Sequence, residues 1–215
     1  MISNILFTSC TIYDIMRLID KFRFSGGEMN LITKKIKYLP ATNNPLSADV
    51  YFIEGDKCCY IYDVGNNDNT LQHINQVKKE KTIILSHYHK DHVGNIDRLN
   101  YSNLYVGKKT YETIEKGIIV ENMLTINDGV KLDIIHCISP HTEGSLIVNI
   151  NNEYTLIADL YFTRFPFDRK KALNMIDILK NINTQYFVIS HQEDGKIVSK
   201  EKLVSELLDY FNLQK

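Results

Sequence analysis

The 215-residue sequence lacks an apolar run of the 18 or so residues that a membrane span needs. It also lacks an excess of charge of one sign, because 25 basic and 26 acidic residues give a net charge of −1. Such a balance offers no electrostatic attraction to nucleic acid or to an acidic membrane surface. We therefore expect neither nucleic acid nor a membrane as a partner.

Cysteine pairs at metal-binding spacing are absent too. The four cysteines show no Cys-X-X-Cys pattern, and we expect them to be reduced and buried. Residues 1–24 lack the basic start, the clean apolar centre and the small-residue cleavage site of a secretory signal. Together these two absences predict a cytoplasmic protein.

The chain is expected to consist of an N-terminal extension and one domain. Residues 1–28 form the extension, whose role is uncertain, and Ile12, Ile15, Met16 and Ile19 within it are spaced to line one face of a short helix. Residues 29–215 are long enough for one domain with a full core. A composition of 44% hydrophobic and 24% charged residues is ordinary for a globular protein.

Strand and helix patterns alternate along this domain, and the strands gather in two halves. Strands are expected at residues 34–39, 50–54, 58–63, 82–85, 104–106, 123–126, 130–138, 145–150, 154–158 and 186–189. Helices are expected at residues 69–79, 96–99, 109–115 and 169–180, and after an N-cap at Ser199. A strand, helix, strand order implies a sheet whose outer face is covered by helices.

The most informative segment is Ser86-His87-Tyr88-His89-Lys90-Asp91-His92, which follows an apolar strand. It holds three of the seven histidines in the chain and a carboxylate. These are the ligand types of zinc, and also of iron or manganese. The alternative is a solvated polar loop without a metal.

Three further donors stand at the ends of apolar strands. They are His141, Asp159 and His191. Together with the first segment they indicate a site for two metal ions. His73, on a predicted helix, and His136, within a predicted strand, are expected to be structural.

The first segment resembles the His-X-His-X-Asp-His signature of the metallo-β-lactamase fold superfamily. Four further segments resemble blocks of that family, in family order: the early Asp-X-Gly turn at 63–65, the His block at 140–145, the strand ending in Asp at 158–159, and the strand ending in His at 190–192. The resemblance covers about residues 30–195. It implies an α/β fold, a four-layer αβ/βα sandwich.

The same resemblance implies the ligand set. His87, His89 and His141 would hold one metal ion, and Asp91, His92 and His191 would hold the second. Asp159 would bridge the two, together with a water or hydroxide that acts as the nucleophile. Asp91 would also orient that water and carry its proton to the leaving group. Zinc is the expected metal, with iron and manganese as alternatives.

Supporting roles are expected for residues near these ligands. Asp63 is the candidate to support the histidine loop, with a turn carboxylate that caps backbone N–H groups as the alternative. Gly65 and Gly144 are expected to allow tight turns. Tyr161 is a candidate hydrogen-bond donor to the substrate, with a pocket wall or core position as its alternative. Tyr88 and Lys90 are expected to line the mouth of the site.

Two departures from the family pattern concern residues that precede ligands, because Ala158 and Ser190 stand where the family commonly has glycine. The bridging Asp159 and the lack of a signal argue against an antibiotic-hydrolysing β-lactamase. The balanced charge argues against a nuclease, and residues 192–215 are too few for the substrate domain of a hydroxyacylglutathione hydrolase. His89 stands where flavodiiron proteins have Glu.

What remains is a metal-dependent hydrolase of a small thioester, ester or lactone. The alternative is a non-catalytic metal-binding sensor or binding module of the same fold. The expected partner is a small-molecule substrate, and the sequence carries no signal of the oligomeric state.

Overall fold

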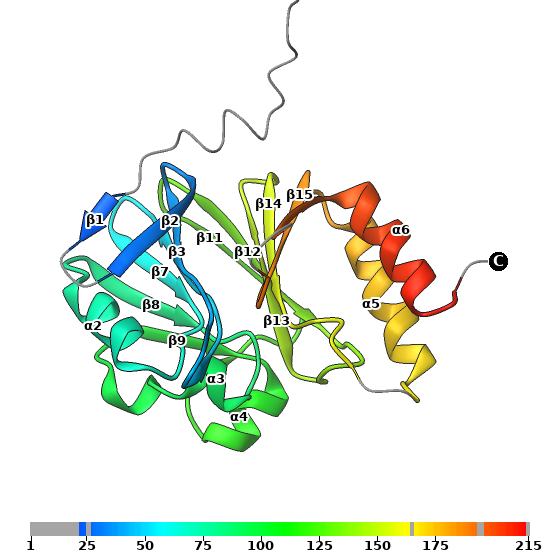
Figure 1. The fold of residues 1–215 in the computed structure, drawn as a ribbon, viewed down its shortest axis with the longest axis horizontal. Coiled ribbons are helices and arrows are strands. Elements are labelled where there is room, and N and C mark those ends of the chain that lie inside the picture. The colour runs from blue at the N-terminus through cyan, green and yellow to red at the C-terminus, as the bar shows by residue number, and fades with distance from the viewer. Residues whose placement is uncertain (1–21, 25–26, 164–165, 193–195, 214–215) are drawn as a thin grey trace, which may run out of the picture.

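A computed structural model describes residues 22–24, 27–163, 166–192 and 196–213. In it two β-sheets face each other, and helices cover the outer face of each sheet (Figure 1). The predicted helix around Ile12–Ile19 lies outside the described residues.

The first sheet comprises eight strands among the described residues, which lie side by side in chain order. They are β1 (Phe22–Phe24), β2 (Gly27–Thr33), β3 (Ile36–Leu39), β6 (Val50–Glu54), β7 (Cys58–Tyr62), β8 (Glu80–Ile84), β9 (Asn103–Val106) and β10 (Ile118–Ile119). Neighbours are antiparallel from β1 to β7 and parallel from β7 to β10. The parallel strands therefore end at one edge of the sheet.

The second sheet comprises six strands in the same part of the chain. They are β11 (Met123–Asn127), β12 (Lys131–Cys137), β13 (Ser145–Ile150), β14 (Tyr154–Ala158), β15 (Tyr186–Ile189) and β16 (Ile197–Ser199). Only β14 and β15 are parallel neighbours. A small hairpin of β4 (Thr42–Asn43) and β5 (Leu46–Ser47) lies in the connection between β3 and β6.

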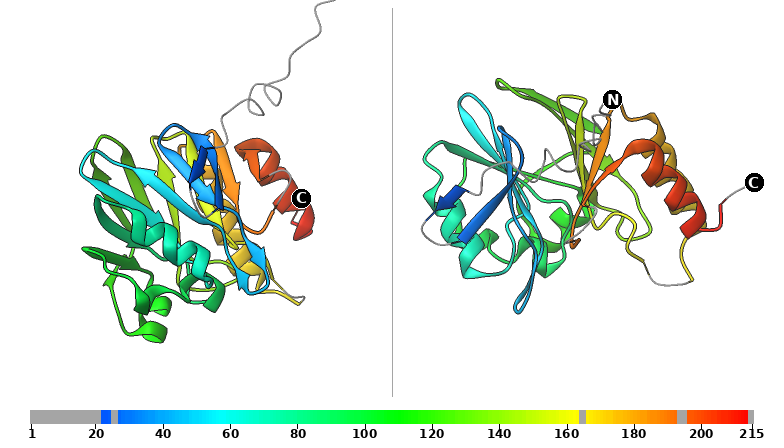
Figure 2. Two further views of the ribbon diagram at one scale, coloured as in Figure 1. Left: turned by 60° about the vertical axis from the view of Figure 1, so that its left-hand side comes forward. Right: turned by 45° about the horizontal axis from the view of Figure 1, so that its top comes forward.

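The helices flank the two sheets. They are α2 (Asp68–Gln76), α3 (Lys90–Val93), a 3₁₀ helix η1 (Ile96–Arg98), α4 (Lys108–Ile114), α5 (Arg169–Asn181) and α6 (Lys200–Tyr210). The first four lie on the side of the first sheet, whereas α5 and α6 lie next to each other on the side of the second (Figure 2). Ser199 caps α6 through its side chain, as predicted.

Three hydrophobic clusters show that the molecule has four layers. One cluster joins residues of both sheets, such as Tyr62 and Leu146. A second lies between the first sheet and its helices, and a third between the second sheet and α5 and α6. This arrangement confirms the predicted four-layer αβ/βα sandwich.

Several element boundaries differ from those predicted. Lys34 and Lys35 form a turn between β2 and β3, so the strand predicted at 34–39 begins two residues later, at Ile36, and β2 was missed. The predicted helix at 69–79 ends at Gln76 because Val77 adopts an extended conformation. Strands β10 and β16 and helix α3 are too short to produce a periodic signal. The predicted domain boundary at 28/29 falls inside β2.

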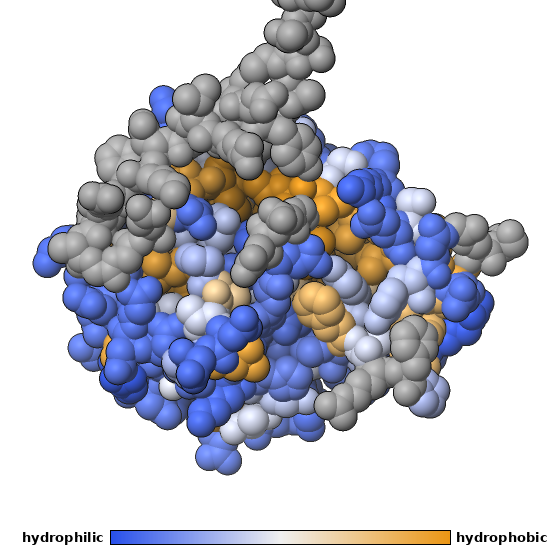
Figure 3. Space-filling view, in the orientation of Figure 1, coloured by the Kyte–Doolittle hydropathy of each residue, from blue (hydrophilic) through white to orange (hydrophobic). Residues whose placement is uncertain are grey.

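The surface seen in Figure 3 is mostly hydrophilic, and its hydrophobic residues gather near the upper rim. No helix of the described residues is long and apolar enough to span a bilayer.

Candidate metal centre

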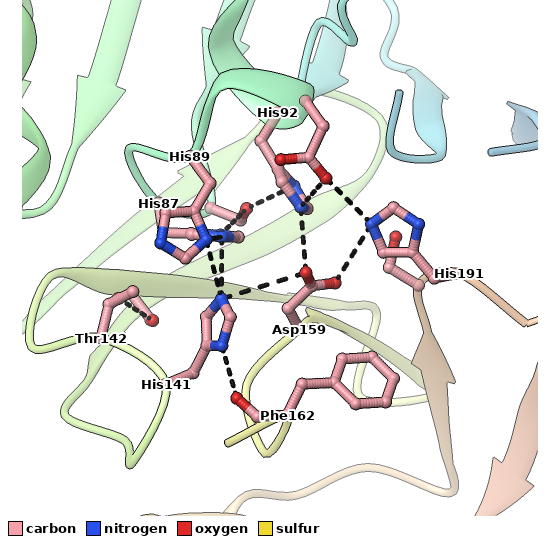
Figure 4. Close-up of polar contacts among 12 residues, drawn as sticks. His87, His89, His92, His141, Thr142, Asp159, Phe162 and His191 are labelled. Carbon is pink, nitrogen blue, oxygen red and sulfur yellow. Dashed lines mark hydrogen bonds and ion pairs between the residues drawn. The ribbon is translucent and has the colours of Figure 1, made fainter. Parts of the chain in front are cut away.

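The predicted donors meet at one end of the sandwich, where strands of both sheets finish. His87 follows β8, and His89, Asp91 and His92 belong to α3 or directly precede it. From the other sheet, His141 lies between β12 and β13, and Asp159 and His191 follow the parallel neighbours β14 and β15. The fold thus brings all seven sequence-predicted donors together (Figure 4).

Three of them form what we call the three-histidine group: His87, His89 and His141. His87 Nε2 lies 3.0 Å from His89 Nδ1, and His141 Nε2 lies 3.1 Å from each of these nitrogens. Tetrahedral zinc with nitrogen ligands at about 2.05 Å would separate those ligands by about 3.3 Å. The three ring nitrogens therefore surround a space that suits one metal ion.

The other four form the mixed group: Asp91, His92, Asp159 and His191. Asp91 Oδ2 lies 3.2 Å from His191 Nε2 and 3.4 Å from His92 Nε2. Asp159 Oδ2 lies 3.3 Å from His92 Nε2 and 3.9 Å from His141 Nε2, while its Oδ1 lies 3.6 Å from His191 Nε2. Asp159 thus faces both groups, as a bridging carboxylate must.

Hydrogen bonds on the outer ring nitrogens fix the orientation of the imidazoles. His92 Nδ1 donates to Asp63 Oδ2 at 2.7 Å, and His87 Nδ1 donates to Ser86 Oγ at 2.9 Å. His141 Nδ1 donates to the carbonyl of Phe162 at 2.5 Å. In the neutral ring, each bond places the proton on the outer nitrogen, so that the other nitrogen faces the cluster and can bind a metal ion.

Asp63 performs both of the roles that its position after β7 suggested. Its Oδ1 accepts the backbone N–H of Ser86 at 2.7 Å, and its Oδ2 accepts the Ser86 hydroxyl at 2.7 Å as well as His92. It is almost fully buried. One carboxylate therefore fixes both the start of the histidine segment and a histidine at its end.

The pKa values of the three-histidine group all fall. Burial, followed by the neighbouring His92 and His141, lowers the pKa of His87 well below its ordinary value. Burial and His141 lower the pKa of His89. Burial also lowers the pKa of His141, although the Phe162 carbonyl opposes it. These imidazoles are consequently neutral at physiological pH, the form that binds a metal ion.

The mixed group behaves in the opposite way. Burial alone would lower the pKa of His92, but Asp63 and Asp159 outweigh it and raise that pKa to about 10. The hydrogen bond that His191 donates to Asp91 raises the pKa of His191. Burial disfavours ionised Asp91, yet His191 and His92 prevail and lower its pKa to about 2. Without a cation, this group therefore holds protons between ionised carboxylates.

A buried atom without a partner supports a cation at this place. Asp159 Oδ1 is buried and has no hydrogen-bond donor among the described residues. A buried carboxylate oxygen without a donor is unfavourable, and a bound cation removes that penalty. Together with imidazole nitrogens of suitable spacing, this oxygen shows that the donor set fits divalent metal ions such as zinc.

The backbone beside the mixed group is unusual. Ala158 has φ +44°, His191 has φ +56° and Asp63 has φ +61°. Residues other than glycine seldom adopt this left-handed region. Ala158 adopts the left-handed conformation at a position where the family commonly has glycine. Ser190 also replaces a common glycine of the family, but there the positive φ falls on the next residue, His191.

The two glycines predicted near the centre serve different purposes. Gly65 has φ +64°, and a Cβ there would meet Ser47 Oγ at 2.6 Å. Gly144 lies in a turn, as predicted, but its φ is not positive, so the turn itself does not require glycine. It is instead needed for close packing, because a Cβ would lie 2.6 Å from Lys109 Cβ.

Other predicted residues lie around the centre. The ring of Tyr88 contacts His89 edge-on, and Lys90 is exposed at the start of α3. The Tyr161 hydroxyl accepts a hydrogen bond from Gln192 at 3.3 Å, and burial followed by Glu206 raises its pKa to about 12.

The two remaining histidines lie outside both donor groups. His73 Nδ1 donates to the carbonyl of Asn69 in α2, and His136 Nε2 donates to the carbonyl of Glu143.

Sequence reasoning missed three residues that support the centre. Ser86 contacts Asp63, His87 and His92, and its place directly before the first ligand was an available signal. Asp49 and Lys196 form a buried ion pair behind His191. No local pattern marks them, because they are 147 residues apart.

Comparison with known proteins identifies the fold. Residues 43–101 match the model of the metallo-beta-lactamase superfamily. This stretch includes Asp63 and the whole histidine segment. A search of curated proteins finds no match.

Solved structures match over most of the chain. A metallo-beta-lactamase from Pontibacter korlensis is 16% identical, with a TM-score of 0.69 over 87% of this chain and 99% of that one. An archaeal metallo-beta-lactamase superfamily protein from Sulfolobus tokodaii is 21% identical, with a TM-score of 0.64 over 85% and 88%. The flavodiiron protein from Giardia intestinalis is 12% identical, with a TM-score of 0.66 over 89% and 61%. At these identities the likeness concerns the fold.

Proposed function

Because this chain has the metallo-β-lactamase fold, and residues 43–101 match the model of that superfamily, we propose that it is a metal-dependent hydrolase. Its substrate is a small thioester, ester or lactone. The observation that carries the proposal is the convergence of seven donors from four segments into two adjoining groups that share Asp159.

The donor set suits two divalent metal ions, with zinc first and iron or manganese as alternatives. Bound there, they would lower the pKa of a water molecule toward 7 and polarise the group to be cleaved. His87, His89 and His141 would hold the first ion, and Asp91, His92 and His191 would hold the second. Asp159 contacts both groups and would serve both ions.

The chain supplies the remaining functions. Asp91 has a carboxylate that stays ionised at neutral pH, and its Oδ2 lies at the centre of the mixed group. It is therefore placed to orient an attacking water and to pass its proton to the leaving group. Tyr161, whose hydroxyl stays protonated because its pKa is raised, is a hydrogen-bond donor for a substrate oxygen.

A cleft beside the mixed group supports a small substrate. Its volume is about 270 Å³, just below the usual range for ligand pockets. Its lining residues are Asn30, Tyr38, Pro40, Ala41, Asn43, Asp49, His191, Gln192 and Lys196. A cytoplasmic location belongs to the same proposal, supported by Cys58, Cys59 and Cys137, which are buried and free.

A sensor or binding module of the same fold is the second candidate. The solved structures with this fold include a flavodiiron protein, so the fold is not confined to proteins named as lactamases. The complete set of donors around Asp159 favours the enzyme, because a binding module has no need of a bridging carboxylate.

Metal content and turnover together test the proposal. The purified protein is loaded with zinc, freed of excess metal and analysed by mass spectrometry, and is then assayed with thioesters, lactones, simple esters and a chromogenic cephalosporin. We expect two metal ions per chain and turnover of a thioester, ester or lactone that stops when a chelator is added. Two metals without turnover would favour the sensor, and less than one metal per chain would overturn both readings.

A further inference from the structure

We propose that Asp49, held in place by Lys196, is a positioning residue for His191 and thereby controls binding of the metal ion at the mixed group. The inference rests on the proposed metal centre. It adds to that centre a buried ion pair that belongs to neither donor group.

The first step is the contact between Asp49 and the segment that carries His191. Asp49 Oδ2 accepts the backbone N–H of His191 at 2.8 Å and the hydroxyl of Ser190 at 3.0 Å. Asp49 precedes β6 in the first sheet, whereas Ser190 and His191 follow β15 in the second. The carboxylate thus joins the two sheets at the ligand itself.

The second step is how Asp49 is itself held. Its Oδ1 accepts Lys196 Nζ at 2.6 Å and the backbone N–H of Ala41 at 3.1 Å. The side chain of Asp49 is fully buried and that of Lys196 is 8% exposed. The Lys196 ammonium also lies 5.1 Å from the centre of the Tyr38 ring. Both oxygens of the carboxylate therefore have two donors each, and its position is fixed.

Lys196 fixes the same segment from its other end. Its carbonyl accepts the backbone N–H of Ile189 at 2.9 Å, and its ammonium reaches the carbonyl of Ile189 at 3.4 Å. The segment that leaves β15 at Ile189 and returns at Lys196 is thus closed at its base. Asp49 is therefore bonded both to His191 and to Lys196.

The third step is why His191 needs such a support. Its φ of +56° lies in the left-handed region, which a histidine leaves readily when nothing holds the backbone. A hydrogen bond from its N–H to a buried carboxylate favours the observed conformation. That conformation directs His191 Nε2 to within 3.2 Å of Asp91 Oδ2.

The effect should be confined to one metal ion. The side chain of Asp49 accepts hydrogen bonds from Ala41, Ser190, His191 and Lys196, and none of these belongs to the three-histidine group. Loss of Asp49 should therefore weaken the second metal ion and leave the first in place.

The test compares metal binding in three variants with the wild type. Zinc is titrated into metal-free protein against a chromogenic chelator, which resolves the two affinities, and thermal unfolding is recorded separately in excess EDTA. Asp49→Ala should weaken the second affinity about 10–100-fold, the range for residues that orient ligands, and leave the first unchanged. In Asp49→Asn with Lys196→Met, the amide oxygen still accepts the His191 N–H and no buried charge is left unpaired. This double variant should recover most of the second affinity.

The control is Asp133→Asn. Asp133 is also buried and also paired with a lysine, Lys131 at 2.7 Å, but it lies on β12 outside both donor groups. It should lower the thermal midpoint and leave both affinities unchanged.

The outcomes separate this inference from the proposed function. If the wild type itself binds fewer than two metal ions, the metal centre is wrong. If the wild type binds two and Asp49→Ala retains both affinities while its thermal midpoint falls, the ion pair is only structural and the inference is wrong. If Asp49→Ala does not fold, the double variant is decisive. A folded double variant that fails to bind a second zinc ion would contradict the inference, because its amide oxygen still accepts the His191 N–H.

Discussion

The two donor groups lie side by side and share the histidine segment, yet they differ in charge. The three-histidine group has only imidazoles, and all three of its pKa values are lowered. The mixed group has two carboxylates, and both of its histidine pKa values are raised. A metal-free mixed group can therefore satisfy its charges with protons, whereas the three-histidine group has only neutral nitrogens that face one another.

The groups also differ in backbone. Ala158, which precedes Asp159, and His191 both have left-handed φ angles, but His87, His89 and His141 do not. The mixed group depends on Asp63 and Asp49, two buried carboxylates outside it. The comparison teaches that one metal position is preorganised by histidine geometry and the other by a surrounding network of charge.

Asp159→Ala should have the largest effect, because it removes the residue that joins the groups. We expect the second metal ion to be lost and hydrolysis to fall by at least about 100-fold, while the three-histidine group keeps one zinc ion. Metal content and initial rates measure both. Asp177→Ala, an exposed change on α5, is the control. A variant that held two metals and the wild-type rate would show that Asp159 is not a bridge.

Asp63→Ala and Ser86→Ala should separate the two groups. Asp63 orients His92, so its loss should weaken the second zinc ion about 10–100-fold. Ser86 accepts from His87, so its loss should act mainly on the first ion, because Asp63 still holds His92. Competition titration with a chelator measures both affinities. Equal effects of the two variants on both ions would break the proposed distinction between the groups.

The sequence predicted the centre better than its supports. His87, His89, Asp91 and His92 stand close together, and His141, Asp159 and His191 follow apolar strands, so residue type and order sufficed to single them out. Asp49 and Lys196 could not be found in this way, because an ion pair across 147 residues has no local pattern. Ser86 looked like an ordinary loop residue until its contacts with Asp63 were seen.

The same distinction holds for the fold. Strands with long apolar patterns, such as β13 and β14, were predicted with correct bounds. Helix α3 was missed because its four residues are shorter than two helical turns. Gly144 was interpreted as a turn residue, but what excludes a Cβ at this position is Lys109, a neighbour that only tertiary packing brings close.

The pH dependence of metal binding should differ between the groups. The pKa of His92 is raised from 6.5 to about 10, so its protonation stabilises the metal-free fold fully below pH 6.5, and this contribution is lost as the pH rises toward 10. A metal ion on His92 must displace that proton. We therefore expect the second zinc ion to release about one proton or more at pH 7.5, and the first ion to release almost none.

Calorimetric titrations in buffers of different ionisation enthalpy measure this proton release for each ion. In Asp63→Ala the pKa of His92 should fall, and less proton should be released with the second ion. Equal release for both ions in the wild type would contradict the difference in charge between the groups.

Ala158→Gly should have the smallest effect and tests the difference in backbone. Relief of the left-handed conformation is worth about 1–2 kcal/mol, whereas the lost burial of one methyl group costs about 0.8 kcal/mol. The metal-free protein should therefore become more stable by up to about 1 kcal/mol. The matched control is Ala172→Gly, which removes an equally buried methyl group within helix α5.

In the control the helical cost of glycine, about 1 kcal/mol, adds to the lost burial, so it should destabilise the protein by about 2 kcal/mol. Urea unfolding in the presence of EDTA measures both variants. If Ala158→Gly destabilised the protein as much as Ala172→Gly does, the left-handed backbone before Asp159 would carry no strain. The left-handed φ of His191 would then be the remaining difference in backbone between the two donor groups.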